Sequence, residues 1–358
     1  MGEQRLTRVK VAEYAVLFWR NGNLIWDDYL HHRQFALTPE SVGILRWFSS
    51  WRDIATIGPT NDLHRAIAER LLEEKILLAE GSEEHQQEQR LLAEWGDWGP
   101  STRYHHFASR TDETIEYLDP VADVEAFSSK AHAEPPPDVV KTFPRQPITV
   151  TTPSIDDASN WPRPGLVDVL FARRSTRSFT TRPLSLDAVG TIIDIAAGPI
   201  DVIENAETGP IIRKTSPSAG ARSSIEIYLH ANRIHGLQPG LYHYAASRGG
   251  LERIRRPARA KLLARALGNQ PWLAEAPALL IYTSVLRRSR WRFSTTRAYR
   301  DILLEAGHIS QTVLLTATAM GLGSVTATAI SDVLIEQIIG VDPISEPVLA
   351  VTAIGYPG

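Results

Sequence analysis

The segment FARRSTRSFT, residues 171–180, gathers the side chains best suited to holding an anion. Arg173, Arg174 and Arg177 lie within five positions, and Ser175 stands among them. A guanidinium group offers a rigid fork of donors that matches phosphate oxygens, and a serine hydroxyl adds a short donor. Arginines at the end of a helix also interact favourably with the helix dipole without any ligand. This basic segment therefore indicates either an anion site or a solvated helix end.

Two other segments consist of small residues that let a ligand approach the backbone. TSPSAGARSS, residues 215–224, is rich in serine, alanine and glycine and directly precedes a predicted strand. The run Gly321-Leu322-Gly323-Ser324 follows a long apolar helix. Small side chains leave N–H groups accessible to the edge of a flat ligand. An ordinary loop is an equally good interpretation of the first segment.

The histidines give weaker signals. His105 and His106 are adjacent in a predicted loop, where one of two neighbours usually packs and the other is solvated. His308 lies in the apolar helix and is predicted to be a hydrogen-bonded core residue. We therefore predict no metal site.

The composition limits the classes of function. The chain has 358 residues, a formal net charge of −3 and no cysteine. The small net charge gives no reason to expect nucleic-acid binding, and the lack of cysteine excludes disulfides and thiolate chemistry. No apolar run reaches the length of about 18 residues needed to cross a membrane, and the N-terminal run is too short for a signal peptide. We expect a soluble, cytoplasmic protein with no membrane association.

Two segments precede the main domain of the chain, residues 1–82 and residues 83–164. Residues 1–82 contain a predicted hairpin, a helix capped by Thr38 and a second helix over 62–78, a combination that resembles a winged-helix-like module. Residues 83–164 hold a polar helix over 83–95, an aromatic loop and a proline-rich linker. The N-terminal helices mix acidic and basic residues, so a peptide-binding or packing role is favoured over nucleic-acid binding.

Residues 165–358 are predicted to form one compact domain of mixed helices and strands. Its strands are predicted over 223–232, 239–247, 277–286 and 347–358. Its helices are predicted over 167–174, 185–199, 256–269 and 302–323.

Taken together, the basic segment, the Pro-Ser-Ala-Gly loop and the Gly-Leu-Gly-Ser run resemble the flavin-binding pattern of the nitroreductase-like fold. The resemblance implies an α+β fold with the FMN domain at 165–358. Within that fold, the segment WGDWGPSTRYHHFASRT and the N-terminal module are similar to the SagB/McbC type of peptide azoline dehydrogenase. The resemblance covers most of the chain and is loosest over the first 80 residues.

The resemblance implies how each segment contacts FMN. Arg173, Ser175 and Arg177 would hold the phosphate and ribityl oxygens, with Arg174 nearby. The isoalloxazine ring would lie between two sets of small residues, with Gln270 as a further hydrogen-bonding candidate. These sets are Pro217, Ser218, Ala219 and Gly220 on one side, and Gly321, Leu322, Gly323 and Ser324 on the other.

The implied reaction is oxidation of a thiazoline or oxazoline ring in a ribosomally made peptide to the aromatic azole. A base removes a ring proton while a hydride leaves for the flavin. The subgroup typically carries a Lys-Tyr pair before an Arg-x-Tyr-Arg run, but this chain has Phe293 and Ser294 there. The remaining candidates for the base are Tyr299, whose arginine neighbours would stabilise a phenolate, and Lys214.

The resemblance also implies partners. We expect a homodimer, an azoline-containing peptide substrate and a cyclodehydratase partner. One alternative is another flavin oxidoreductase on the same fold that uses NAD(P)H, although the N-terminal module argues against it. A second alternative is a flavin-binding scaffold subunit of a peptide-modifying complex, which the missing Lys-Tyr pair leaves open.

Overall fold

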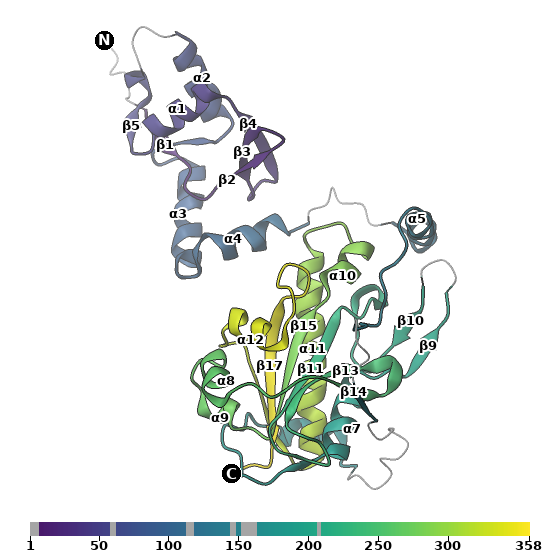
Figure 1. Ribbon diagram of the computed structural model, residues 1–358. Coiled ribbons are helices and arrows are strands. Elements are labelled where there is room, and N and C mark those ends of the chain that lie inside the picture. Colours follow the sequence, from purple (N-terminus) through teal and green to yellow (C-terminus); the bar gives the residue numbers. More distant parts are fainter. Residues whose placement is uncertain (1–6, 58–61, 112–117, 144–147, 152–162, 206–208) are drawn as a thin grey trace. The chain divides into compact units, whose positions relative to one another are not determined.

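The computed structural model describes residues 7–57, 62–111, 118–143, 148–151, 163–205 and 209–358. The chain divides into two compact units, Met1–Glu116 and Tyr117–Gly358 (Figure 1). The division falls inside the predicted middle part, 83–164, so the polar helix belongs with the first unit and the linker with the second. In the part of the chain that the structure describes, no helix is long and apolar enough to cross a bilayer.

The described residues of the first unit form two small antiparallel sheets and four α-helices around one core. One sheet has the order β5-β1-β6 and the other β2-β3-β4. The strands are β1 (Arg8–Val11), β2 (Val16–Arg20), β3 (Asn23–Asp28), β4 (Arg33–Leu37), β5 (Arg52–Asp53) and β6 (Leu77–Ala79). The helices are α1 (Pro39–Trp47), α2 (Asp62–Glu73), α3 (Glu83–Trp95) and α4 (Gly99–Ala108).

Local chemistry explains where several of these elements begin and end. Asn21 and Gly22 both have positive φ, which is the geometry that the tight turn between β2 and β3 requires. The Thr38 side chain accepts from the backbone N–H of Ser41 and caps α1, as predicted.

Two predictions for this unit are wrong. The helix expected over 62–78 ends at Glu73, because Lys75 has a φ of 62° and the apolar residues that follow form β6. The segment GDWGPSTRYHHF, expected to be a loop, forms α4 from Gly99 onward. Its aromatic residues are explained by packing, since Tyr104 and Phe107 contact the core of the first unit.

The second unit is built on a seven-stranded sheet of order β16-β17-β15-β11-β13-β14-β7, in which all neighbouring strands are antiparallel. These strands are β7 (Ile148–Thr151), β11 (Ile225–Ala231), β13 (Gly240–Ala245), β14 (Gly250–Arg255), β15 (Ala278–Ser284), β16 (Gly323–Ala327) and β17 (Val348–Gly355). Smaller pairs join β8 (Leu184–Ser185) to β12 (Ile234–His235) and β9 (Asp201–Ile203) to β10 (Ile211–Arg213). Strand β7 lies in the region predicted to be only a linker.

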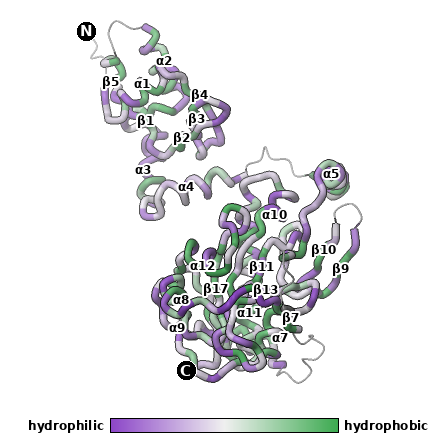
Figure 2. Tube along the Cα trace, in the orientation of Figure 1, coloured by the Kyte–Doolittle hydropathy of each residue, from purple (hydrophilic) through white to green (hydrophobic). Residues whose placement is uncertain are grey.

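Helices cover both faces of this sheet. On one face α7 (Leu186–Ala197) and α11 (Ala298–Ala319) pack on alternate residues of β11 and β15. On the other face lie α8 (Ala260–Ala266), α9 (Pro271–Ala274) and α12 (Asp332–Ile339). Two further helices are α6 (Leu166–Ala172) and α10 (Leu286–Arg292). Hydrophobic residues are concentrated along the central strands and the helices beside them (Figure 2).

The structure confirms the α+β class and most of the predicted elements of this unit. Among the described residues it adds helices that were not expected from the sequence, namely α5 (Pro120–Ala133), α9, α10 and α12. The Asp119 side chain caps α5. Helix α11 is one-sided, because Ile302, Ile309 and Val313 are buried while Leu303 and Leu304 are exposed. It therefore packs on the sheet and is not enclosed on all sides.

Candidate functional site

The basic segment lies beside the Gly-Leu-Gly-Ser run. Helix α6 ends at Ala172, and the chain then becomes extended so that Ser175 forms a parallel bridge with Ser324. The backbone N–H of Thr176 donates to the carbonyl of Ser324 over 3.1 Å. Two segments about 150 positions apart are thus joined edge to edge.

Glycine is required at this junction. A Cβ on Gly323 would lie 2.7 Å from both Cγ2 and Oγ1 of Thr176, so any side chain there would push the two segments apart. Gly321 ends α11 with a φ of 71°, the left-handed conformation that glycine adopts at helix ends. Ser324 itself is buried, and its Oγ finds no hydrogen-bond partner among the described residues.

The polar side chains around this junction differ in whether they already bind other groups of the protein. The Nη1 of Arg174 donates to the carbonyls of Phe171 and Arg173, so this guanidinium is engaged in closing the helix end. The guanidinium of Arg177 is exposed and lies 5.9 Å from the ring centre of Trp272. Gln270 uses its amide nitrogen to bind the carbonyls of Leu267 and Ala329.

The small-residue loop, Pro217 to Ser223, has an unusual backbone. Gly220, Ala221 and Ser223 all have φ between 50° and 57°. The backbone N–H of Ser223 donates to Ser218 Oγ, and Arg222 Nε donates to the Gly220 carbonyl. The loop is therefore folded onto itself, with the open side of Gly220 limited by α10.

Helix α11 lies along this loop. Ser224 Oγ donates to Glu305, Ser216 shares a hydrogen bond with Thr312, and His308 Nδ1 lies 3.4 Å from the carbonyl oxygen of Pro217. The prediction that His308 is a core residue is wrong, because its side chain is on the exposed face of the helix. The contact with Pro217 follows from that exposure.

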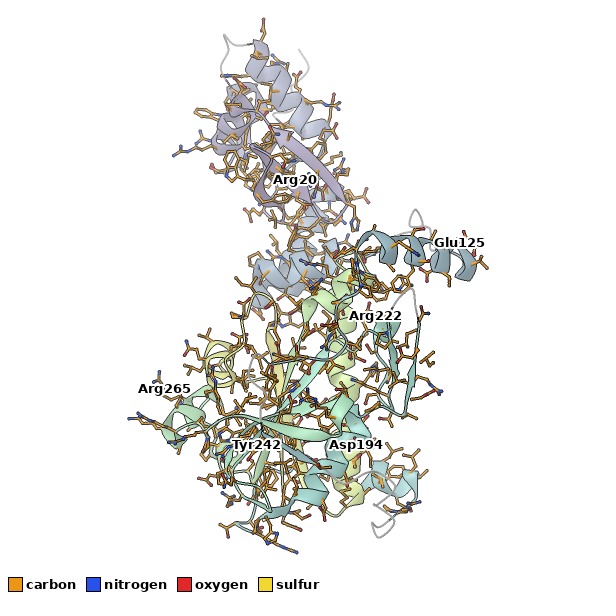
Figure 3. The ribbon with its side chains drawn as sticks, turned by 45° about the vertical axis from the view of Figure 1, so that its right-hand side comes forward. Arg20, Glu125, Asp194, Arg222, Tyr242 and Arg265 are labelled. Carbon is orange, nitrogen blue, oxygen red and sulfur yellow. The ribbon has the colours of Figure 1, made fainter. Side chains whose placement is uncertain are left out.

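The loop and the basic segment lie at opposite ends of the sheet. The loop leads into Ile225 at the start of β11, whereas Ser324 is aligned through β17 and β15 with Ala231 at the end of β11. At about 3.3 Å per residue, roughly 20 Å of strand separate the two ends. Arg222 marks the loop end in Figure 3, near α5, and the C-terminus marks the other end in Figure 1.

This separation changes the expected site. Within one chain, Gly321, Leu322, Gly323 and Ser324 belong with the arginines and not with Pro217, Ser218, Ala219 and Gly220. From the sequence, the two sets of small residues were expected on either side of one flavin ring. A single chain does not bring them together.

The two candidate bases lie in different environments, both nearer the loop end. Tyr299 is 40% exposed in the first turn of α11, about 9 Å along the helix axis from Glu305 at a rise of 1.5 Å per residue. Lys214 lines a cavity of about 20 Å³, which holds about one water molecule. Burial lowers the pKa of Lys214, although Glu305 and Glu226 oppose that shift.

A buried charge network beside this cavity was not identified from the sequence. Glu226 on β11 accepts from His243 Nε2 over 2.6 Å and pairs with Arg288 Nη1 at 2.7 Å. All three residues are buried. Burial on its own would raise the pKa of Glu226, but hydrogen bonds from His243 and Arg288 lower it to about 2. Glu226 alternates with apolar residues in SSIEIYLHAN, and this unusual position was the available signal.

The network also fixes the segment that precedes β7. Arg288 Nε donates to the carbonyl of Asp138, and Trp291 Nε1 donates to that of Glu134. Lys141 binds both the Tyr228 hydroxyl and the Glu346 carboxylate. The end of α5 and the chain after it are thus held by side chains of α10 and the sheet.

Histidines do not form a metal site in the described part of the chain. His106 packs against Trp95 and Phe107 in the first unit, and His105 lies beside it on α4. Among the residues that the structure describes, no group of three or more His, Asp or Glu side chains is arranged to hold a metal ion.

The chemistry of the donors fits a flavin mononucleotide. Guanidinium groups and the exposed Ser175 hydroxyl suit a phosphate, and the Ser324 Oγ beside them is a buried polar atom without a partner. At the other end, the loop presents Pro217, Ala219 and Gly220, whose small side chains suit a flat aromatic ring. Each end thus offers what one part of the cofactor requires.

The buried network predicts a dependence of stability on pH. The lowered pKa of Glu226 contributes stability above the unfolded-state pKa near 4.5, and this contribution is lost as the pH falls towards 2. We expect Glu226→Gln to lower the free energy of unfolding by about 3 kcal/mol at pH 7, because Arg288 is left buried without its carboxylate. The difference from the wild type should shrink as the pH falls below about 4.5.

Urea titrations followed by circular dichroism at several pH values measure this effect. Glu204→Gln removes an exposed carboxylate from the same unit and serves as the control. An equal loss of stability at pH 7 and pH 3 for Glu226→Gln would contradict the assignment.

Comparisons with known proteins agree with this architecture. The Nitroreductase family profile matches residues 170–356, more than half of the chain. A protein of Methanocaldococcus jannaschii that is named as a nitroreductase is 36% identical over 174 residues, 49% of this chain and 83% of that protein. The trifolitoxin-processing protein TfxB of Rhizobium leguminosarum bv. trifolii is 30% identical over 171 residues, 47% of this chain.

Solved structures are more distant in sequence. A structure from Anabaena variabilis named as a nitroreductase has a TM-score of 0.48 at 20% identity and covers 70% of this chain and 50% of its own. The Escherichia coli microcin synthetase McbBCD complex has a TM-score of 0.45 at 22% identity, covering 75% and 94%. The chain spans about half the length of TfxB and of the Anabaena structure. On the evidence of the matched region and of the M. jannaschii relative, the chain belongs to the nitroreductase family.

Proposed function

We propose that the chain is an FMN-dependent oxidoreductase whose cofactor phosphate is held by the basic segment. The observation that carries this proposal is the Ser175–Ser324 bridge, which brings the arginines, two hydroxyls and a side-chain-free Gly323 to one place within the family domain. Arg173, Ser175 and Arg177 would hold the phosphate and the ribityl oxygens, while Arg174 closes the helix end.

We further propose that the active form is a homodimer in which the two ends of the sheet meet across the interface. The basic segment of one copy and the small-residue loop of the other would then reach one cofactor, which the separation within one chain otherwise prevents. Two helices offer apolar surface for such an interface. These exposed side chains are Leu166, Val167, Leu170 and Phe171 on α6, and Leu303 and Leu304 on α11.

The proposed substrate is a peptide with a thiazoline or oxazoline ring, which would be oxidised to the azole. Support comes from the resemblance to the SagB/McbC type and from the relative named for processing trifolitoxin. When bound, FMN supplies a two-electron acceptor for a hydride. The chain's own contribution would be to orient the ring over the loop and to remove one proton from it. The N-terminal unit and a cyclodehydratase partner would serve to recruit the peptide.

We propose Tyr299, in preference to Lys214, as the group that accepts this proton. A base must come within hydrogen-bond reach of the substrate. Tyr299 is exposed at the end of α11, whereas the cavity beside Lys214 is too small for a peptide ring. Burial lowers the pKa of Lys214, which makes its ammonium group easier to deprotonate, so this residue stays the second candidate.

Two other functions would use the same cofactor. An NAD(P)H-dependent reductase would bleach the bound flavin when given a reduced nicotinamide, and an azoline dehydrogenase would do so when given its peptide. A scaffold subunit would bind FMN and do neither. Both assays on the purified, flavin-loaded protein therefore separate the three proposals.

Removing Arg173 tests the phosphate site. We expect Arg173→Ala to weaken FMN binding by roughly 10-fold to 150-fold, since a hydrogen bond to a charged group contributes about 1.5–3 kcal/mol. Flavin fluorescence quenching measures the dissociation constant. Arg213→Ala, which removes an exposed arginine from β10, is the control and should bind FMN as the wild type does. Equal affinity in all three proteins would exclude this site.

Mixed dimers test whether two copies share each cofactor. Gly220→Val should disable the loop, because the left-handed backbone and the contact with Arg292 leave no room for a branched side chain. Neither Arg173→Ala nor Gly220→Val alone should bind FMN well. A mixed dimer of the two would keep one site with both halves intact, and its FMN binding should return to about half the wild-type occupancy. If both halves came from one chain, mixing would restore nothing.

The proton acceptor can be identified from turnover. We expect wild-type protein with FMN to remove two hydrogens from an azoline peptide, and Tyr299→Phe to do so about 10²–10⁴ times more slowly while keeping its flavin. Mass spectrometry of the peptide measures the product. Wild-type rates in Tyr299→Phe together with a slow Lys214→Ala would assign the role to Lys214 instead.

A further inference from the structure

Helix α5 lies outside the region that matches the nitroreductase family, yet it contacts the small-residue loop. It occupies Pro120–Ala133, whereas the family match begins at residue 170. Figure 3 shows α5, marked by Glu125, close to the labelled Arg222 of the loop. Two side chains of α5 face this region, and each contacts an arginine that in turn reaches Gly220.

The first connection runs through Asp123. Its carboxylate pairs with Arg292 Nη2 at 2.5 Å, and Arg292 is mostly covered. The Arg292 Cγ lies 2.9 Å from the position that a Cβ on Gly220 would occupy. The aliphatic part of Arg292 therefore rests on the backbone of Gly220 while its guanidinium is tied to α5.

The second connection runs through Phe127. The Arg222 guanidinium lies 5.6 Å from the ring centre of Phe127 and 5.4 Å from that of Trp291, and the two rings meet edge to face at 4.9 Å. The guanidinium of Arg292 lies 4.3 Å from the same Phe127 ring. Arg222 is buried, and its Nε donates to the Gly220 carbonyl over 3.0 Å. Phe127 thus supports both arginines at once.

The loop needs support of this kind. Ala221 and Ser223 have left-handed backbones, which residues with a Cβ adopt unfavourably. Without outside contacts, such a segment would relax towards ordinary dihedral angles. A positive charge in an aromatic pocket and a short ion pair are interactions strong enough to oppose that relaxation.

We propose that α5 is a clamp that holds the small-residue loop in its ligand-binding shape, with Asp123 and Phe127 as positioning residues. The expected effect of the clamp on FMN affinity rests on the proposed function. Its effect on the shape of the loop does not, and can be measured without FMN.

Hydrogen exchange of the FMN-free 358-residue chain tests the clamp directly. We expect the amides of residues 218–223 to exchange about threefold faster in Asp123→Asn, because an ion pair that is partly exposed contributes only modestly. We expect about tenfold faster exchange in Phe127→Ala, where two cation–π contacts are lost. Amides of β15 should be unchanged. Phe127→Tyr keeps the ring face and should restore slow exchange.

Matched controls come from the same helix. Glu125→Gln removes a carboxylate and Val124→Ala removes apolar atoms, and both side chains are exposed. Neither should alter the loop. Asp123→Asn combined with Arg292→Gln should exchange no faster than Arg292→Gln alone, because the two residues act through one contact.

FMN titration of the same variants separates this proposal from the proposed function. The dissociation constant should rise by about the same factors as the loop exchange. If the loop exchanges faster but wild-type protein binds no FMN, the clamp stands and the flavin site is wrong. Unchanged loop exchange in both variants, or equal acceleration in β15 and the loop, would overturn the clamp.

Discussion

The antiparallel pairing of β11 is the constraint on which the arrangement of the site depends. This strand is central in the sheet, pairing with β13 on one side and β15 on the other. Its first residue continues from the small-residue loop, and its last is aligned with the Ser175–Ser324 junction. Because the register is fixed by buried side chains on both faces, neither end can shift toward the other. A cofactor that requires both ends must recruit the second from elsewhere.

Charge is buried at the loop end of β11. Glu226 and Arg288 lose hydration in the core, and His243 and the Ser223 and Asp138 carbonyls replace that hydration with directed hydrogen bonds. A buried ion pair adds little net stability relative to apolar residues, but breaking it is costly. Its effect is to fix the position of α10, which places Trp291 and Arg292 beside the loop. The conformation of the loop therefore depends on the buried ion pair.

The sequence predicted the elements whose signals are local. The Asn21-Gly22 turn, the Thr38 cap and the apolar run of β15 all follow from nearest neighbours. The basic segment and the Gly-Leu-Gly-Ser run were identified by residue type, and their contact is now explained by Thr176 and Gly323. Helix α4 was missed because its aromatic residues are there for tertiary packing. The distance between the two halves of the site depends on strand order and register, which no local pattern encodes. The Glu226 network was missed for the same reason, since its members come from three separate elements.

The chain from Glu134 to Lys141 has a consequence for where the family domain can be cut. Three of its groups bind buried side chains of that domain. The carbonyl of Glu134 accepts a hydrogen bond from Trp291, and that of Asp138 accepts one from Arg288. The ammonium group of Lys141 pairs with the Glu346 carboxylate. A protein begun at residue 165, just before the family match, would lose the acceptor of the buried Trp291 indole, and Arg288 and Glu346 would each lose one of their partners. The segment that completes this interior therefore begins at or before Glu134, well ahead of the family match at residue 170. The family match marks the residues that relatives share, whereas the hydrogen bonds of the interior mark the residues that the domain needs in order to fold.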